Sequence, residues 1–291
     1  MWKVMFWLAL SLGLASAQAA PNLVLVPGFF NSAIPAPEHL GDPWMQPYFS
    51  HDIVNHLKTR SPNLWVVDNL SPLGSIEENG QRLIQFLQNR QADFKGQPII
   101  LIAHSAGGLY SLYAAAHSNL PIDHIIALST PFRGLKFLSV MEAQHIPLET
   151  LSVPFCLENL VNLKEEVIQP FVANLTLQRP LKMDVFAGYQ KSSLFFWDWH
   201  VLSAPLAALD AFVAEPSDGI VTVQSSLGVS DFQARNPANL TVNVHSAALP
   251  LEHWEMAVEA SLTRLYGVEN IGSLREAQAW MYSYVLQQSG L

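Results

Sequence analysis

Three residues of this chain could together carry out nucleophilic catalysis at a carbonyl group. Ser105 lies at the centre of Ala-His-Ser-Ala-Gly (residues 103–107), which matches the nucleophile-elbow pattern small-x-Ser-x-Gly. A serine hydroxyl is a poor nucleophile near neutral pH and needs a histidine as general base, itself oriented by a carboxylate. On sheets that carry such an elbow the partners follow in the order serine, acid, histidine. Asp218 and His253 stand downstream in that order. We therefore predict Ser105 as nucleophile, Asp218 as acid and His253 as base.

The sequence leaves alternatives open for both partners of Ser105. Asp218 lies in Ser-Asp-Gly, and Asp-Gly is also an ordinary turn. For the base, His245 at the end of the last expected strand is the alternative to His253. His104 directly precedes Ser105, and because adjacent side chains point apart we expect it beside the elbow rather than acting as base. Four further aspartates remain possible as the acid: Asp184, Asp198, Asp210 and Asp231.

Short apolar runs alternate with helical patterns along most of the chain. Runs rich in Val, Ile and Leu predict buried strands, and apolar residues at helical spacing predict amphipathic helices. The expected strands are residues 22–26, 64–67, 98–102, 122–128, 183–187 and 240–244, and the expected helices are residues 51–59, 75–90, 107 onward, 137–145, 157–172, 256–266 and 273–287. This alternation predicts an α/β fold with a doubly wound, mostly parallel sheet.

The expected elements place the three residues at one edge of that sheet. Ser105 would follow the strand at residues 98–102 and precede a helix. The backbone N–H of Ala106, at the start of that helix, could then face a developing oxyanion. Pro27 and Gly28 follow the strand at residues 22–26, and such a turn leaves N–H groups unpaired at the carboxyl end of a strand, where ligands bind in doubly wound sheets.

The N-terminal residues predict export. Lys3 precedes an apolar stretch over residues 4–14, and small-x-small patterns follow at residues 15–17 and 17–19. These features are typical of a secretory signal peptide. We expect residues 1–19 to be removed and residues 20–291 to form one domain that is secreted or periplasmic. No segment of the mature chain has the apolar length of a transmembrane span.

Charge and motif content argue against several classes of partner and cofactor. The formal net charge is −9 and no basic block is visible, which argues against nucleic acid as a partner. The ten histidines include no His-Glu-x-x-His, and Cys156, the only cysteine, cannot build a thiolate metal site. No Gly-rich phosphate-binding or dinucleotide-binding motif is present, so no cofactor is expected.

On these residues the chain resembles a secreted bacterial lipase of the α/β-hydrolase superfamily, of the Pseudomonas type. The matching segments are residues 22–29, 76–83, 103–108, 129–134, 218–221 and 252–255, whereas residues 135–213 match poorly. The resemblance implies an α/β-hydrolase fold with a helical cap or lid inserted at about residues 135–181. It assigns Ser105, Asp218 and His253 as above and implies that Phe29 and Ala106 supply the backbone N–H groups of an oxyanion hole.

The chain also departs from the family pattern. Pro27 stands where the family usually has His before Gly, so the hydrogen bonds of that imidazole are missing. The family often holds a structural calcium with a carboxylate two residues after the catalytic histidine. Glu255 stands there and Asp198 could be its partner, but no metal is assigned.

The expected function is hydrolysis of acylglycerol esters through an acyl-enzyme, by a lipase working at a lipid–water interface. A soluble carboxylesterase or thioesterase for short acyl chains is the alternative among enzymes. From another class, the alternative is a non-catalytic binding protein that keeps the same fold. The serine, aspartate and histidine together argue against that last reading.

Overall fold

The computed structural model describes residues 20–29, 48–72, 74–145, 160–189, 213, 215–258 and 271–291. The predicted signal peptide, residues 1–19, lies outside the described residues, as do residues 146–159 of the predicted cap. Asp198 and Asp210 lie outside them too. None of the helices within the described ranges has the length and apolar character needed to cross a bilayer.

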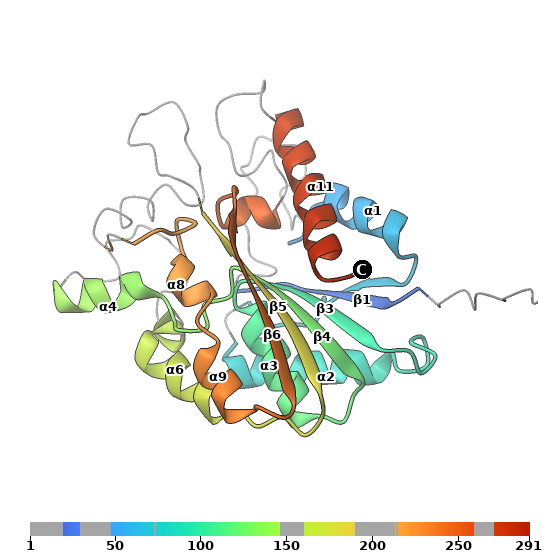
Figure 1. Ribbon diagram of the computed structural model, residues 1–291, viewed down its shortest axis with the longest axis horizontal. Coiled ribbons are helices and arrows are strands. Elements are labelled where there is room, and N and C mark those ends of the chain that lie inside the picture. Colours follow the sequence, from blue (N-terminus) through green and yellow to red (C-terminus); the bar gives the residue numbers. More distant parts are fainter. Residues whose placement is uncertain are drawn as a thin grey trace, which may run out of the picture.

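Six parallel strands form the sheet at the centre of the described chain (Figure 1). They are β1 (Asn22–Val26), β2 (Leu64–Val66), β3 (Ile99–His104), β4 (Ile122–Leu128), β5 (Leu181–Gly188) and β6 (Leu240–Leu249). Their order is β2-β1-β3-β4-β5-β6, and every neighbouring pair is parallel. The doubly wound parallel sheet is therefore confirmed. Only β6 differs much from expectation, because it continues five residues beyond Val244.

Helices cover both faces of the sheet (Figure 1). On one face lie α1 (His51–Arg60) and α11 (Ile271–Gln288), and on the other lie α2 (Ile76–Asn89) and α3 (Gly107–His117). The remaining elements are α4 (Lys136–Ala143), α6 (Glu165–Asn174), α8 (Val223–Ser226), α9 (Ser230–Arg235) and the short 3₁₀ helices η2 (Val161–Leu163) and η3 (Trp254–Met256).

Alternate residues of each strand enter two separate cores. Val24 and Leu101 pack with α2 and α3, whereas Leu25 and Ile102 pack with α1 and α11. All four are fully buried. Strands buried on both faces are mostly apolar, which is why β1 and β4 could be located from sequence with the bounds that the structure has, although β4 carries Asp123 and His124 in its first half.

The described ends of the predicted cap belong to the core of the domain. Phe137 and Met141 of α4 and Ile168 and Val172 of α6 are buried in the same cluster as the sheet. The single helix expected over residues 157–172 is instead η2 followed by α6, with Lys164 in extended conformation between them. The rest of the predicted cap, residues 146–159, lies outside the described residues, so the lid stays a prediction.

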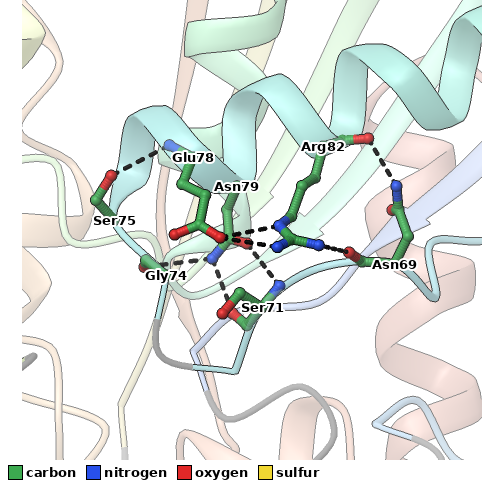
Figure 2. Close-up of polar contacts among 7 residues, drawn as sticks. All are labelled: Asn69, Ser71, Gly74, Ser75, Glu78, Asn79 and Arg82. Atoms are coloured by element: carbon green, nitrogen blue, oxygen red, sulfur yellow. Dashed lines mark hydrogen bonds and ion pairs between the residues drawn. The ribbon is translucent and has the colours of Figure 1, made fainter.

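Helix α2 begins with a capped first turn that also holds the preceding loop (Figure 2). Ser75 Oγ accepts a hydrogen bond from the Glu78 N–H at 3.1 Å, which makes Ser75 the N-cap of the helix. Asn79 is fully buried and reaches back from the helix. Its Oδ1 accepts from the Ser71 N–H at 2.8 Å, and its Nδ2 donates to the carbonyls of Ser71 at 3.0 Å and Gly74 at 3.3 Å. One side chain thus adds three hydrogen bonds to the backbone bond of the loop, from the Gly74 N–H to the Ser71 carbonyl at 3.3 Å.

A second set of contacts ties the same helix to the residues after β2 (Figure 2). Arg82 donates to the Glu78 carboxylate at 2.9 and 3.0 Å and to the Asn69 carbonyl at 3.2 Å. Asn69 Nδ2 donates to the Arg82 carbonyl at 2.9 Å. The loop between β2 and α2 is therefore held to α2 at Asn69 through Arg82, and at Ser71 and Gly74 through Asn79.

Candidate active site

The carboxyl ends of β1 and β3 meet at the point where the chain changes direction across the sheet. From β1 the chain moves outward to β2, and it then returns to the other side of β1 to form β3. Because loops leave such a pair of strands in opposite directions, a crevice opens there, and open α/β sheets bind ligands in it. Gly28 and Phe29 follow β1 at this point, and Ser105 follows β3.

Ser105 has the backbone conformation of a nucleophile elbow. Its φ is +56°, in the left-handed region that a non-glycine residue adopts only when the surrounding structure enforces it. The Ser105 N–H donates to the Leu128 carbonyl at 2.9 Å, which fixes the turn to β4. Neighbouring backbone leaves no room for larger residues: a Cβ on Gly107 would lie 2.4 Å from the Val26 carbonyl oxygen, and one on Gly28 would lie 2.7 Å from Ser105 Cβ.

Ser105, His253 and Asp218 form a continuous line of hydrogen bonds. Ser105 Oγ lies 2.9 Å from His253 Nε2, and His253 Nδ1 lies 2.8 Å from Asp218 Oδ2. The serine hydroxyl can donate to Nε2 only if the imidazole proton is on Nδ1, where it is donated to the carboxylate. The structure therefore brings together the three residues that the sequence selected, in the geometry of a base oriented by an acid.

Backbone groups orient the carboxylate of Asp218. Its Oδ1 accepts from the N–H groups of Ile220 at 3.0 Å and Val221 at 2.7 Å, which leaves Oδ2 for the histidine. The turn needs Gly219, whose φ is +93°. The Asp218 carbonyl in turn accepts from the His253 N–H at 2.9 Å, so the two loops are joined through backbone as well as side chains.

The three side chains are largely shielded from water. Ser105 is 8% exposed, His253 is 2% exposed and Asp218 is fully buried. Removal of water lowers the local dielectric and strengthens the interaction of the carboxylate with a charged imidazole. The Asp218 carboxylate and the His253 ring therefore interact in a site from which water is largely excluded.

One of the two expected oxyanion donors, Ala106, follows Ser105 directly, and the other, Phe29, lies in the loop after β1. Ala106 is the residue before α3, and its N–H donates to no backbone carbonyl among the described residues. Phe29 ends the described loop after β1 and is buried. Their positions agree with a role in holding an oxyanion, and that role stays a prediction.

The alternative residues lie elsewhere or outside the described part. Asp184, in the middle of β5, is bonded to His124 Nε2 at 2.6 Å and His245 Nε2 at 2.7 Å. His245 is therefore partnered within the sheet, in the interior of β6 rather than at its end. Asp231 lies in α9, and its side chain is not described.

Asp184 is the centre of a buried polar cluster that sequence patterns did not indicate. Asn243 Nδ2 donates to its carboxylate at 3.0 Å, and Lys182 Nζ lies 3.1 Å from it. Burial alone would raise the pKa of Asp184, but hydrogen bonds from His124, His245, Asn243 and Lys182 outweigh it and hold the pKa well below the usual range. The cluster arises because neighbouring strands place these residues on one face of the sheet.

His104 lies beside the site, and among the described residues no hydrogen bond joins its ring to the Ser105 hydroxyl. Its Nδ1 is 2.7 Å from the hydroxyl of Tyr48, and its ring centroid is 4.6 Å from that of His253. Tyr48 precedes α1 and is 56 residues away in sequence. No local pattern points to this contact, because only the tertiary fold brings the two residues together.

Within the described ranges, no group of three or more His, Cys, Asp or Glu residues is arranged to hold a metal ion. Glu255 is buried, and its Oε2 accepts from the Glu252 N–H at 3.2 Å. Asp198, its suggested calcium partner, lies outside the described residues.

Comparison with known proteins places the fold. Neither a protein-family model nor a curated protein sequence matches the chain. Among solved structures, mature Bacillus licheniformis lipase BlEst2 matches with a TM-score of 0.55 at 18% identity, over 81% of this chain and 86% of that chain. EstA from Clostridium botulinum matches with a TM-score of 0.59 at 13% identity, over 94% and 88%. The metagenomic carboxyl esterase MGS0156 matches with a TM-score of 0.54 at 14% identity, over 94% and 77%. Likenesses at these identities establish a shared architecture, and the chain has the α/β-hydrolase fold.

Proposed function

We propose that the protein hydrolyses carboxylic esters, with Ser105 as nucleophile, His253 as general base and Asp218 as the acid that orients it. The observation that carries the proposal is the hydrogen-bonded line from Ser105 Oγ through His253 to Asp218, on an elbow with positive φ. Solved structures of the same fold described as a lipase and a carboxyl esterase support the class of reaction.

In the proposed reaction, Ser105 Oγ attacks the ester carbonyl while His253 Nε2 takes the hydroxyl proton. The negative charge moves to the carbonyl oxygen, which would be held by the N–H groups of Ala106 and Phe29. The tetrahedral intermediate then expels the alkoxide, which receives the proton from His253 Nε2, and an acyl-enzyme remains. Water repeats the sequence and releases the carboxylic acid.

For the substrate we propose acylglycerols presented at a lipid–water interface, as the resemblance to Pseudomonas-type lipases implies. A carboxylesterase or thioesterase for short acyl chains is the alternative, and the neighbouring structures include proteins described as a lipase and as an esterase. Export is part of the proposal, with residues 1–19 as signal peptide. The intact mass of secreted protein would support it if those residues were missing.

The first prediction concerns Ser105. Ser105→Ala should lower kcat on an activated ester by about 10⁴-fold or more, because a nucleophile and its base act as a unit. A fluorophosphonate probe should label the wild-type protein and fail to label the variant. The fold should be unchanged by circular dichroism.

Two results would oppose the proposal. Full activity of folded Ser105→Ala would show that another group attacks the ester. A wild-type protein that hydrolyses no ester and takes up no probe would favour the non-catalytic binding protein instead.

A further inference from the structure

Tyr48 and His104 form a buried pair between the two loops of the site. The Tyr48 hydroxyl lies 2.7 Å from His104 Nδ1, and both residues are buried. The same hydroxyl lies against Gly28, since a Cβ there would be 2.8 Å from it. The phenol therefore touches the loop after β1 on one side and the elbow after β3 on the other.

The surroundings of the pair favour the uncharged form of both side chains. Burial raises the pKa of Tyr48 far above its usual value, although the backbone N–H of Gly28 acts in the opposite direction. Burial, and then the neighbouring His253, lower the pKa of His104 well below the usual value for histidine. Tyr48 is thus a neutral phenol and His104 a neutral imidazole. A neutral phenol can donate its proton and a neutral imidazole nitrogen can accept it, so the Tyr48 hydroxyl can donate to His104 Nδ1.

The His104 ring packs on the ring of the proposed base. The two centroids are 4.6 Å apart with an interplanar angle of 44°. His253 is held at its two nitrogens by Ser105 and Asp218, and His104 supports it from the side. The Tyr48–His104 pair therefore lies beside the ring of His253.

We propose that Tyr48 and His104 are positioning residues for the reaction, which couple the loop of Gly28 and Phe29 to the ring of His253. This inference rests on the proposed ester hydrolysis. The Tyr48 hydroxyl fixes the ring orientation of His104, and His104 in turn keeps His253 aligned with Ser105. A misplacement of reacting groups by about 1 Å can cost about 10²-fold in rate, so a small loss of alignment should be measurable.

The test compares kcat and KM for a soluble p-nitrophenyl ester among variants of the whole chain. Tyr48→Phe removes only the hydroxyl and should lower kcat by about 10-fold with KM changed less than about twofold, because alignment and not binding is lost. His104→Leu should lower kcat by at least as much. The double variant should be no slower than His104→Leu alone, since both changes break the same coupling. If His104→Leu does not fold, His104→Gln replaces it in this comparison.

Tyr110→Phe is the matched control. Tyr110 is also a buried tyrosine, with its pKa raised to a value far above the usual by burial, but it packs in the core on the α2 and α3 face. Removal of its hydroxyl should cost some thermal stability and leave kcat unchanged. A loss of kcat in Tyr110→Phe equal to that in Tyr48→Phe would show that any buried hydroxyl has this effect and would overturn the inference.

Two other outcomes would overturn it. Tyr48→Phe with kcat within twofold of wild type would show that the hydroxyl does not position the base. Losses that multiply in the double variant would show that Tyr48 and His104 act separately. Failure of the proposed function is distinguishable, because then the wild-type protein itself would neither hydrolyse the ester nor take up the fluorophosphonate probe.

Discussion

Asp218 and Asp184 are both fully buried carboxylates that accept hydrogen bonds from histidine, yet their surroundings differ. Asp218 is oriented by backbone N–H groups in a turn and bonds one histidine, which reaches a serine hydroxyl. Asp184 is surrounded by side chains from three strands and bonds two histidines. In the first arrangement the far nitrogen of the histidine is bonded to a serine hydroxyl, whereas in the second both histidines are bonded to the same carboxylate.

The second prediction therefore compares these two residues. Asp218→Asn should lower kcat on a soluble ester by about 10⁴-fold, because the amide no longer fixes the His253 tautomer or stabilises the imidazolium. Asp184→Asn should leave kcat within a few-fold of wild type in protein that is folded. Steady-state rates at a temperature where both variants are folded check this. If Asp184→Asn lowered kcat more than Asp218→Asn did, Asp184 on β5 would be the acid.

The third prediction concerns stability and pH. Folding lowers the pKa of Asp184. Its ionised carboxylate therefore adds to the free energy of unfolding above the unfolded pKa of about 3.9, and this addition is lost as the pH falls from there toward the lower folded pKa. At neutral pH, Asp184→Asn should lower the free energy of unfolding by about 3 kcal/mol, since it removes one side of a buried charge network. Denaturant unfolding from pH 7 to pH 3 should show the gap to wild type narrowing below about pH 4. A gap that stays constant over this range would contradict the assignment.

At the scale of elements, the loop between β2 and α2 depends on one buried amide. Asn79 makes three hydrogen bonds to the backbone of Ser71 and Gly74, as Figure 2 shows. The fourth prediction is that Asn79→Ala lowers the free energy of unfolding by about 1–3 kcal/mol, because buried backbone groups lose their partners. Gln81→Ala on the same helix is the control, because the Gln81 bond to Tyr113 is exposed and its loss should cost less than about 0.5 kcal/mol. Equal losses in thermal unfolding would show that the loop does not need the amide.

How well the elements could be predicted depended on how local their signals are. Strand β1 is almost entirely apolar and β4 ends in four apolar residues, 125–128, so both were found with the bounds that the structure has. The continuation of β6 through Ser246, Ala247 and Ala248 has no apolar alternation and was missed. Helices α8 and α9 are four and six residues long, too short for a helical period to be visible, and were not predicted.

Some residues of the candidate site have a local sequence signal, and others have none. Ser105 has a local motif, and chain order then selected Asp218 and His253 from several candidates. The structure shows their contacts, which no local pattern contains. The Tyr48–His104 pair and the Asp184 cluster have no sequence signal, because strand register and loop packing bring their members together.

At the scale of the whole molecule, the substrate question turns on the predicted cap. Helices α4 and α6 bury apolar residues in the core shared with the sheet, and residues 146–159 of the predicted cap lie outside the described residues, so the lid stays a prediction. Apolar surface exposed by an open lid costs about 25 cal/mol per Å² in water, and a lipid surface that covers it favours the open form.

The fifth prediction follows from that balance. The initial rate on a long-chain glyceride should rise when its concentration passes the solubility limit, and emulsified substrate should be hydrolysed faster than dispersed monomers. Rates measured across that limit, with a soluble short-chain ester as control, test it. A smooth hyperbola through the limit together with a preference for short acyl chains would identify an esterase.

The hydrogen bond from Ser105 to His253 joins residues 148 positions apart, across strands that are all parallel. Parallel pairing needs long crossovers, and contacts distant in sequence form slowly because loop closure must precede them. Secondary structure can therefore form early during refolding, before the hydrogen bonds among Ser105, His253 and Asp218 are complete. Labelling by the fluorophosphonate probe would then report the last step of folding. During refolding it should recover more slowly than the helical signal in circular dichroism.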